Sequence, residues 1–222
     1  MNNTENKPLM VLAGIGEGLG TALAARFAEG GYRVVGLSRS AREWPLPGYF
    51  AIACDLTKEA EVKATFEQIE RQHGVPEVVI HMVGDLLIAP YLQLSAAAFE
   101  GVWRSMVLSA MLVSQQAVTR MLPAVHGTLL FAGATASLRG GARFAAFASA
   151  KFALRGLAQS LAREFHSQGI HVAHVILDGL IGDADGTELD PVALAESFWM
   201  LAHQPHSAWT HELDLRAQLE RF

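Results

Sequence analysis

Four glycines within the segment Gly14–Gly20 form the part of the chain whose chemistry is easiest to interpret. The segment directly follows the apolar run Leu9–Ala13 and leads into a stretch with helical spacing. Glycine allows the backbone to approach a ligand closely, and the free N–H groups at the start of a helix attract phosphate oxygens. The sequence therefore predicts a phosphate-binding turn, or a tight turn without a ligand, built from Gly14, Gly16, Gly18, Leu19 and Gly20.

Alternating strand and helix patterns must position this turn. The runs predicted as strands are Leu9–Ala13, Arg33–Ser38, Phe50–Cys54, Glu77–Val83, Thr128–Ala132, Ile170–Leu177 and Trp209–Leu215. The predicted helices are Gly18–Gly30, Glu59–His73, a stretch from its cap Ser95 to Leu122 with a break, Phe144–Gln168, and Pro191–His203 capped by Asp190. Continuous apolar strands between helices are typical of an α/β fold, so we expect one doubly wound parallel sheet of about seven strands with helices on both faces.

The composition is typical of a soluble globular protein. Of the 222 residues, 51% are hydrophobic and 18% are charged, which favours a single domain over residues 1–222. A net charge of -5 without basic clusters argues against nucleic acid as a partner, and no apolar run approaches the ~18–20 residues of a membrane helix. The polar N-terminus and the single Cys54 predict a cytoplasmic, reducing location. We expect flexibility in residues 1–7 and mobile loops at Ser40–Tyr49 and Gly179–Asp190.

Three short motifs connect the glycine turn to a known family. Gly14, Gly18 and Gly20 match the pattern T-G-x-x-x-G-x-G with Ala13 in place of the threonine, whereas G-x-G-x-x-G would require glycine at position 19. The run Cys54-Asp55-Leu56-Thr57 matches D-[LV]-T, and Lys151 stands at the lysine of Tyr-x-x-x-Lys. In these motifs the chain resembles the short-chain dehydrogenase/reductase family over almost its whole length. The resemblance implies a Rossmann-like, nucleotide-binding domain, oxidoreductase activity with a nicotinamide cofactor, and a short substrate-lid loop at residues 179–190.

The resemblance also implies which residues bind the cofactor. Asp55 reaches the adenine or caps the next helix, while His81-Met82-Val83-Gly84 replaces Asn-Asn-Ala-Gly and Asp178-Gly179 replaces Pro-Gly. NADP(H) is favoured over NAD(H), because Ser38 does not repel a 2′-phosphate and Arg39 can pair with it. Glu17 argues against this preference, and Arg39 could instead be a solvated charge. The implied cofactor residues are Gly14, Gly16, Gly18, Leu19, Gly20, Ser38, Arg39, Asp55, Leu56, Val83, Gly84, Lys151 and Gly179.

The catalytic positions implied by the resemblance have largely lost their chemistry. The family uses a tyrosine as proton donor, a serine to orient the substrate, an asparagine that holds a water, and a lysine. Here these positions are Phe147, Ala134, Met106 and Lys151, and only the lysine is retained. Phenylalanine, alanine and methionine carry no transferable proton, and losing a positioned general acid typically costs ~10²–10⁴ in rate. The sequence therefore predicts a degenerate active site.

Several other residues could supply the missing chemistry. The candidates are the hydroxyls of Thr135, Ser137 and Ser149, the carboxylates of Asp85, Asp178 and Asp183, and His81. The Ala-rich helix face favours a packed position for Ser149 over a catalytic one, and His81 is expected to be a core or cofactor-side histidine rather than an acid. We expect no metal site, because His203 and His206 lack carboxylate neighbours and His171 and His174 point to opposite faces of one strand.

Three functions remain open on the sequence. The first is an NADP(H)-dependent oxidoreductase of divergent mechanism acting on a small molecule. The second is a catalytically inert cofactor-binding sensor, scaffold or partner subunit, and the third is a non-redox enzyme on the same fold. The intact cofactor motifs favour the first two functions over the third. The missing tyrosine favours the second over the first, whereas the family as a whole favours the first, which we adopt as the expectation. The apolar segments Trp103–Leu122 and Phe144–Leu161 suggest a helix–helix interface in a homodimer or homotetramer, or else heavily buried core helices.

Overall fold

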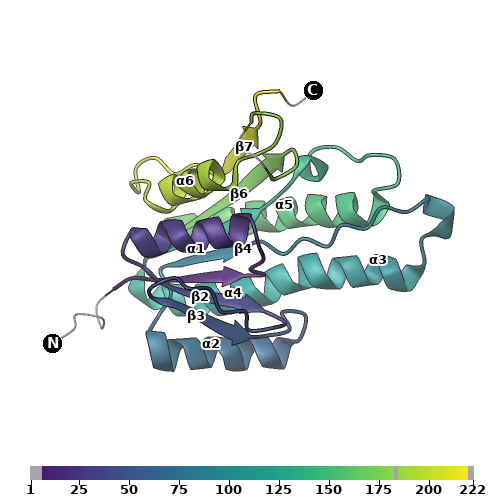
Figure 1. Ribbon diagram of the computed structural model, residues 1–222. Helices are drawn as coiled ribbons and strands as arrows, with labels where there is room; N and C mark the ends of the chain where they lie inside the picture. Colours follow the sequence, from purple (N-terminus) through teal and green to yellow (C-terminus); the bar gives the residue numbers. More distant parts are fainter. Residues whose placement is uncertain (1–6, 183–184, 220–222) are drawn as a thin grey trace.

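A single parallel sheet organises the chain, as the computed structural model of residues 7–182 and 185–219 shows (Figure 1). Its seven strands lie in the order β3-β2-β1-β4-β5-β6-β7. The order reverses between β1 and β4, which confirms the predicted doubly wound fold. The strands are β1 Leu9–Ala13, β2 Arg33–Ser38, β3 Tyr49–Ala53, β4 Val78–His81, β5 Gly127–Ala132, β6 Ile170–Asp178 and β7 Glu212–Arg216.

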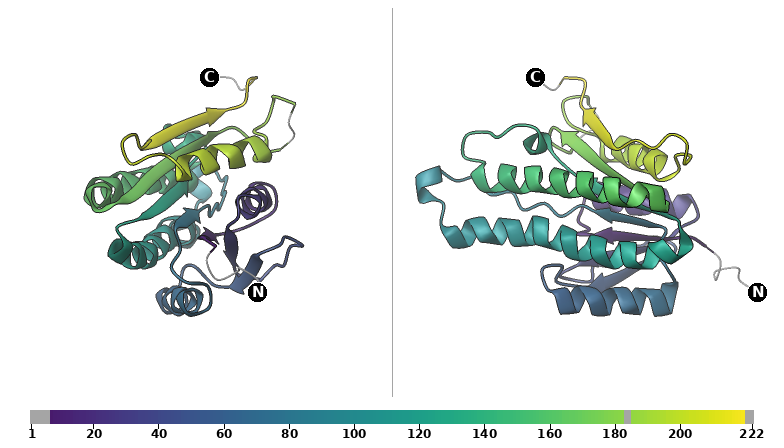
Figure 2. Two further views of the ribbon diagram at one scale, coloured as in Figure 1. Left: turned by 90° about the vertical axis from the view of Figure 1, so that its left-hand side faces the viewer. Right: turned by 180° about the vertical axis from the view of Figure 1, so that it is seen from behind.

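Helices cover both faces of the sheet because successive strand residues point to opposite sides (Figure 2). On β1, Met10 and Leu12 pack in the layer of α1 (Leu19–Glu29) and α6 (Pro191–Ala202). The alternate residues Leu9 and Val11 pack in the opposite layer. That layer contains α2 Glu59–His73, α4 Ser109–Met121 and α5 Ala145–Phe165.

Most predicted elements are confirmed, and the differences in their ends have physical reasons. Strand β3 ends before Cys54 and β4 ends at His81, and the residues that follow, including Cys54 and Val83, line a cleft instead of continuing the sheet. The long helix α5 ends at Phe165 and gives way to a tighter turn over His166–Gln168. The last strand begins at Glu212 because Trp209 stacks on His171 instead, with ring centroids 4.9 Å apart.

The predicted break in the helix after Ser95 is a wide turn. Ser95 accepts a hydrogen bond from the backbone N–H of Ala98 at 3.1 Å and so caps α3, Ala96–Trp103. A π-helical turn over Arg104–Leu108 then inserts one extra residue before α4. This turn directs the Met106 side chain into a small apolar cluster, where it is fully buried.

The stretch Ala96–Ala124 corrects one expectation from the sequence. By length and composition alone it could cross a membrane, since its mean hydropathy over the best window is 1.3. Of that window 33% is buried inside the protein, and residues of α4 such as Val113 and Ala117 pack against the sheet.

Two segments expected to be mobile are described only in part. Lys7 is the one residue of 1–7 that the structure describes, and residues 183–184 of the predicted lid lie outside the described part. The rest of the lid is held by a bridge between Ile181 and Leu189 and by the bond from the Gly182 N–H to the Leu189 carbonyl at 3.1 Å. These contacts connect the two ends of this short loop.

The cap of α6 provides a test of the fold. A carboxylate oxygen of Asp190 accepts the backbone N–H of Val192 at 2.9 Å, and Pro191 occupies the first helical position. We expect Asp190→Ala to lower the free energy of unfolding by about 1 kcal/mol, a fall in Tm of about 2–4 °C, because one helix N–H loses its partner. Asp190→Asn retains a capping oxygen and should leave Tm close to that of the wild type. Equal losses in both variants by calorimetry would contradict the capping role.

Candidate functional site

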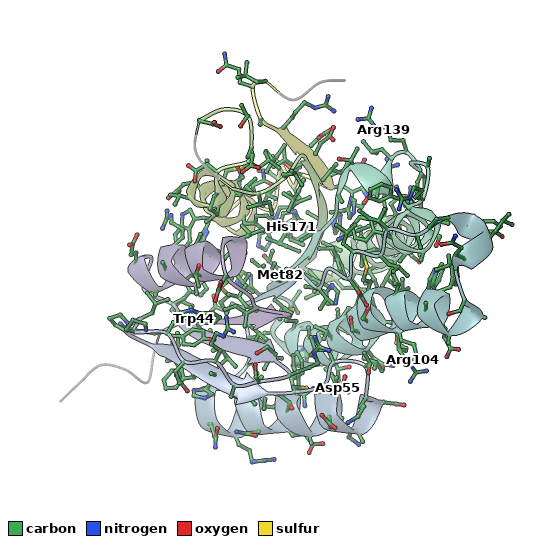
Figure 3. The ribbon with its side chains drawn as sticks, turned by 45° about the vertical axis from the view of Figure 1, so that its right-hand side comes forward. Trp44, Asp55, Met82, Arg104, Arg139 and His171 are labelled. Atoms are coloured by element: carbon green, nitrogen blue, oxygen red, sulfur yellow. The ribbon has the colours of Figure 1, made fainter. Side chains whose placement is uncertain are left out.

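A cleft opens where the strand order reverses, at the carboxyl ends of β1, β2, β3 and β4. Its volume is about 430 Å³. Figure 3 shows two residues of this region: Asp55 lies near the start of α2, and Met82 lies where the chain leaves β4. Parallel sheets of this topology bind ligands at this position. The cleft is lined by Gly14, Ile15, Ser38, Arg39, Cys54, Asp55, Leu56, Thr57, Val83, Gly84, Asp85 and Ser105.

The glycine turn brings the backbone to the wall of the cleft. Gly14 has a φ of +90°, and a Cβ there would lie 2.5 Å from Cγ2 of Val83, so no larger residue fits. Gly18 precedes α1 with a φ of +71° and no side chain caps the helix. The N–H groups in the first turn of α1 therefore have neither an intrahelical partner nor a side-chain cap. The side chain of Leu19 packs in the core, so only its backbone faces the glycine turn.

Asp55 is held in a turn beside the cleft. Its Oδ1 accepts hydrogen bonds from the N–H of Thr57 at 3.0 Å and from the Thr57 hydroxyl at 2.7 Å. These two bonds, with the Lys58 ammonium nearby, hold the pKa of Asp55 below its ordinary value. Lys58, rather than Asp55, immediately precedes α2, so the predicted alternative role of Asp55 as the helix cap is wrong.

An exposed ion pair lies beside the glycine turn. Nη1 of Arg42 lies 2.7 Å from Oε1 of Glu17. Arg39, on the same loop as Arg42, lines the cleft and is exposed, and the Ser38 hydroxyl donates to the Ser40 carbonyl at 2.6 Å. The negative charge of Glu17, which would repel a 2′-phosphate, is thus offset by a neighbouring arginine.

Lys151 is buried at the end of β5. Its Nζ donates to the carbonyl of Ala132 at 2.8 Å, and the residue is only 4% exposed. Burial lowers the pKa of Lys151 to about 8. Phe147 lies one helical turn earlier on α5, with its ring centroid 5.7 Å from the ammonium. The helix therefore presents an aromatic ring and a buried cation together.

The two other implied catalytic positions are Ala134 and Met106. Ala134 lies two residues beyond Ala132 and begins the short turn Thr135–Ser137. Met106 is fully buried and packs with residues of α5, including Ala146 and Ala150. Its side chain thus belongs to the apolar cluster that supports this part of α5.

The hydroxyls proposed as substitutes for the tyrosine are engaged in internal contacts. Thr135 donates to Oδ1 of Asp178 at 2.5 Å, and Oγ of Ser137 lies 3.3 Å from Nε2 of His174. Ser149 donates to the Ala146 carbonyl at 2.9 Å and accepts from the indole of Trp103 at 3.0 Å. Ser149 is thus packed between α5 and α3.

The remaining candidates for the missing chemistry lie in different parts of the structure. His81 is fully buried, and its Nε2 lies 2.8 Å from Oγ of Ser109. Burial, with a smaller effect of the Lys151 charge, lowers the pKa of His81 to about 3, so the imidazole is neutral and belongs to the core. Asp85 does line the cleft, where it accepts the Ser105 hydroxyl at 2.6 Å. Asp183 lies outside the described residues.

The cleft lining and the residues predicted from the sequence overlap in part. Four lining residues were missed, namely Ile15, Cys54, Thr57 and Ser105. Cys54 and Thr57 flank Asp55 in sequence, and Ile15 lies between two predicted glycines, so position alone could have suggested them. Ser105 had no such signal, because the π-helical turn sets its orientation. The predicted residues outside the lining are Gly16, Gly18, Leu19, Gly20, Lys151 and Gly179.

Among the described residues, no group of three or more His, Cys, Asp or Glu side chains could hold a metal ion. His171 stacks on Trp209, whereas His174 faces Ser137, so the two histidines of β6 have different neighbours.

Comparison with known proteins identifies the family. A sequence profile described as short chain dehydrogenase matches residues 8–185. Carbonyl reductase family member 4 of Danio rerio is 29% identical over 180 residues, which span 78% of this chain and 75% of the relative. A short-chain dehydrogenase from Rhodopseudomonas palustris is 36% identical, with a TM-score of 0.85 over 94% of this chain and 98% of the other.

Two further solved structures share the fold and contain a nicotinamide cofactor. ElxO with NADP bound is 18% identical, with a TM-score of 0.87 over 95% of this chain and 98% of the other. The 3-ketoacyl-(acyl-carrier-protein) reductase from Brucella melitensis, in complex with NADH, is 20% identical, with a TM-score of 0.87 over 97% of this chain and 98% of the other. These matches confirm the Rossmann-like fold. Since the profile covers most of the chain, the protein belongs to the short-chain dehydrogenase family.

Proposed function

We propose that the protein is an NADP(H)-dependent oxidoreductase with a degenerate active site. The observation that carries this proposal is the cleft at the sheet reversal, where the glycine turn that leads into the uncapped start of α1 contributes Gly14 and Ile15 beside residues from the loops after β2, β3 and β4. The nicotinamide supplies hydride transfer when it is bound. The other steps of the reaction depend on the side chains of this chain.

The residues present fit a dinucleotide. The first turn of α1 offers backbone N–H groups to a pyrophosphate, and a Cβ at Gly16 would meet no atom within 4 Å, so the backbone there is open. Oδ1 of Asp55 takes both bonds from Thr57, whereas Oδ2 lies 3.5 Å from the Lys58 ammonium and has a further lone pair that can accept from an adenine amine. Lys151 retains donors beyond its bond to Ala132 and would hold the ribose.

Charge at the far end of the cleft supports NADP(H) over NAD(H). Arg39 is exposed and lines the cleft, and the negative charge of Glu17 is offset by its ion pair with Arg42. An arginine fork binds a phosphate through several donors, whereas an NAD-preferring site has an acidic residue at the position of Ser38. Solved structures of the fold contain either cofactor, so the preference rests on these side chains.

Cofactor titration tests this preference. We expect NADPH to bind about one to two decades more tightly than NADH, because a charge-assisted pair contributes ~1.5–3 kcal/mol. Arg39→Ala should weaken NADPH binding and leave NADH binding nearly unchanged in calorimetry. Arg163→Ala, which removes an exposed arginine near the other end of α5, is the control. Equal affinities for the two cofactors, or an unchanged NADPH affinity in Arg39→Ala, would remove Arg39 from the site.

The degenerate site follows from the surroundings of Lys151. Phe147 excludes water from one side of the ammonium but has no proton to give, and Ala134 has no hydroxyl to orient a substrate. The nearby hydroxyls of Thr135 and Ser137 are directed to Asp178 and His174. Ordinary carbonyl reduction through the family's tyrosine route is therefore expected to be very slow.

The same observation favours a second candidate function. With Phe147 beside Lys151 and no tyrosine between Tyr91 and the C-terminus, the chain could bind a cofactor without turnover, as a sensor, scaffold or partner subunit. Measurable oxidation or reduction of any small molecule by the wild-type protein would decide for the oxidoreductase. Tight cofactor binding without turnover would decide for the inert role.

Restoring the missing phenol and hydroxyl tests whether their absence limits the reaction. The double variant Phe147→Tyr/Ala134→Ser adds a phenol one helical turn from Lys151 and a hydroxyl beside it. We expect NADPH-dependent reduction of a panel of common aldehydes and ketones to rise at least tenfold, within the ~10²–10⁴ usually contributed by a general acid. Phe152→Tyr adds a phenol on the exposed part of the same helix and should have no effect. Wild-type rates on the order of 1–10³ per second would show that another residue is the acid.

We also propose that the protein assembles as a homodimer or homotetramer in the cytoplasm. Met111 of α4 and Phe152 of α5 remain 39% and 45% exposed, so both helices keep apolar surface outside the core. Cys54 is a buried free thiol, which suits a reducing compartment.

Light scattering at micromolar concentration tests the assembly. We expect a particle of at least twice the 23.9 kDa chain mass, because pairing α4 and α5 would bury their exposed apolar residues. The double variant Met111→Lys/Phe152→Glu should shift the particle toward the mass of a single chain. A wild-type monomer would contradict the proposed interface.

A further inference from the structure

Two rows of side chains extend from the last strand to the turn that begins at Ala134. In the sheet, Glu212 of β7 lies opposite His174 of β6, and Arg216 lies opposite Asp178. Residues four apart on a strand share a face, so both pairs point toward the same side of the sheet. That side is the layer of α5, which contains Lys151.

The first row begins at Arg155 of α5 and runs over the α5 face of the sheet. Arg155 donates through Nε and Nη2 to the carboxylate of Glu212, at 2.6 and 2.7 Å. The same carboxylate lies 3.4 Å from Nδ1 of His174, whose Nε2 lies 3.3 Å from Oγ of Ser137. Ser137 in turn accepts the backbone N–H of Ala134 at 3.2 Å. The hydrogen-bonded fork of Arg155 lowers the pKa of Glu212, and burial lowers that of His174 to about 4, so the carboxylate is ionised and the imidazole neutral at pH 7.

The second row is shorter. Arg216 forms an ion pair with Asp178, and the hydroxyl of Thr135 donates to the other oxygen of that carboxylate at 2.5 Å. Asp178 is only 1% exposed. A buried carboxylate costs several kcal/mol unless charge and hydrogen bonds compensate it, so Asp178 must keep both partners.

The two rows meet at the segment that receives Lys151. A Cβ at Gly133 would lie 2.3 Å from Nε2 of His174, which shows how closely the imidazole packs against this backbone. Gly133 connects Ala132, whose carbonyl binds the Lys151 ammonium, with Ala134. The backbone that holds the buried cation is therefore fixed from both sides.

We propose that Glu212 and Arg216 act as positioning residues, which set the segment Ala132–Ser137 through His174 and Asp178 and thereby hold Lys151 in place. We call these four side chains the β7 clamp. The assignment of Lys151 to the site rests on the proposed function, but the mechanical role of the clamp does not. The C-terminal strand β7 then helps to position the site, although three strands separate it from β1 and the glycine turn.

Hydrogen exchange of the backbone tests the clamp directly. Glu212→Gln removes the charge that holds Arg155 and His174 but keeps the size of the side chain. We expect the amides of Ala134 and Ser137 to exchange at least about tenfold faster in this variant, because the segment opens more easily. Asp214→Asn removes an exposed carboxylate from the same face of β7 and should leave these rates within about twofold of the wild type.

A second pair of variants tests the same segment if Glu212→Gln is poorly folded. Thr135→Val keeps the shape of the side chain but removes the hydroxyl bound to Asp178, whereas Thr135→Ser keeps the hydroxyl. Faster exchange at residues 134–137 in Thr135→Val, with near-normal rates in Thr135→Ser, supports the clamp. Similar rates in both variants, or acceleration spread evenly over α5 and β6 with a fall in Tm, would overturn it in favour of a general packing role.

The pH dependence of NADPH binding, followed by cofactor fluorescence, separates positioning from packing. Binding by the wild-type protein should weaken as the Lys151 ammonium loses its proton, with a midpoint near its pKa of about 8. In Glu212→Gln the loosened segment admits water, which relieves the desolvation of the ammonium and should move the midpoint upward by about one pH unit. An unchanged midpoint would overturn the link to Lys151. A wild-type protein that fails to bind NADPH would refute the proposed function, and the exchange rates would still decide the clamp.

Discussion

The hydrogen bond between the Lys151 ammonium and the Ala132 carbonyl is the constraint around which the site is organised. A cation that is only 4% exposed must find acceptors within the protein, since the transfer of a charge from water to the interior is costly. This requirement ties α5 to the carboxyl end of β5. It also keeps the neighbouring imidazoles of His81 and His174 uncharged, because a second cation there would be opposed both by burial and by the first.

Apolar side chains pack on one side of this cation. Met106, at the position that the family resemblance assigns to an asparagine, packs with Val102, Ala146 and Ala150 in one apolar cluster, and Phe147 packs against it. Such a cluster stabilises α3 and α5 against each other by excluding water. The neighbouring cleft at the carboxyl ends of β1 to β4 has a polar lining instead.

Much of the fold was predictable from the sequence, because its signals are local. Most strands contain a continuous apolar run, Asp190 and Ser95 are caps next to the helices they begin, and the glycines mark the turn after β1. Ser38, Arg39 and Asp55 line the cleft as expected, since residues at strand ends meet at one edge of a parallel sheet. The bonds of Thr135 to Asp178 and of Ser137 to His174 join residues about forty positions apart, and no sequence period encodes them. The stacking of Trp209 on His171, which shortens β7, is likewise a tertiary effect.

The wide turn at Arg104–Leu108 lets the helix hold one extra residue without changing the face that α4 presents to the sheet. An extra residue in a regular helix rotates everything beyond it by about 100°, and a π-helical turn offsets nearly all of that rotation because each of its hydrogen bonds spans one more residue. Deleting a single residue from the turn would therefore restore regular geometry with Val113 and Ala117 still facing inward. The same deletion in the regular helix α1 would swing buried Leu23 and Phe27 toward solvent. The loss of one codon is therefore expected to be far less damaging at the wide turn than in α1.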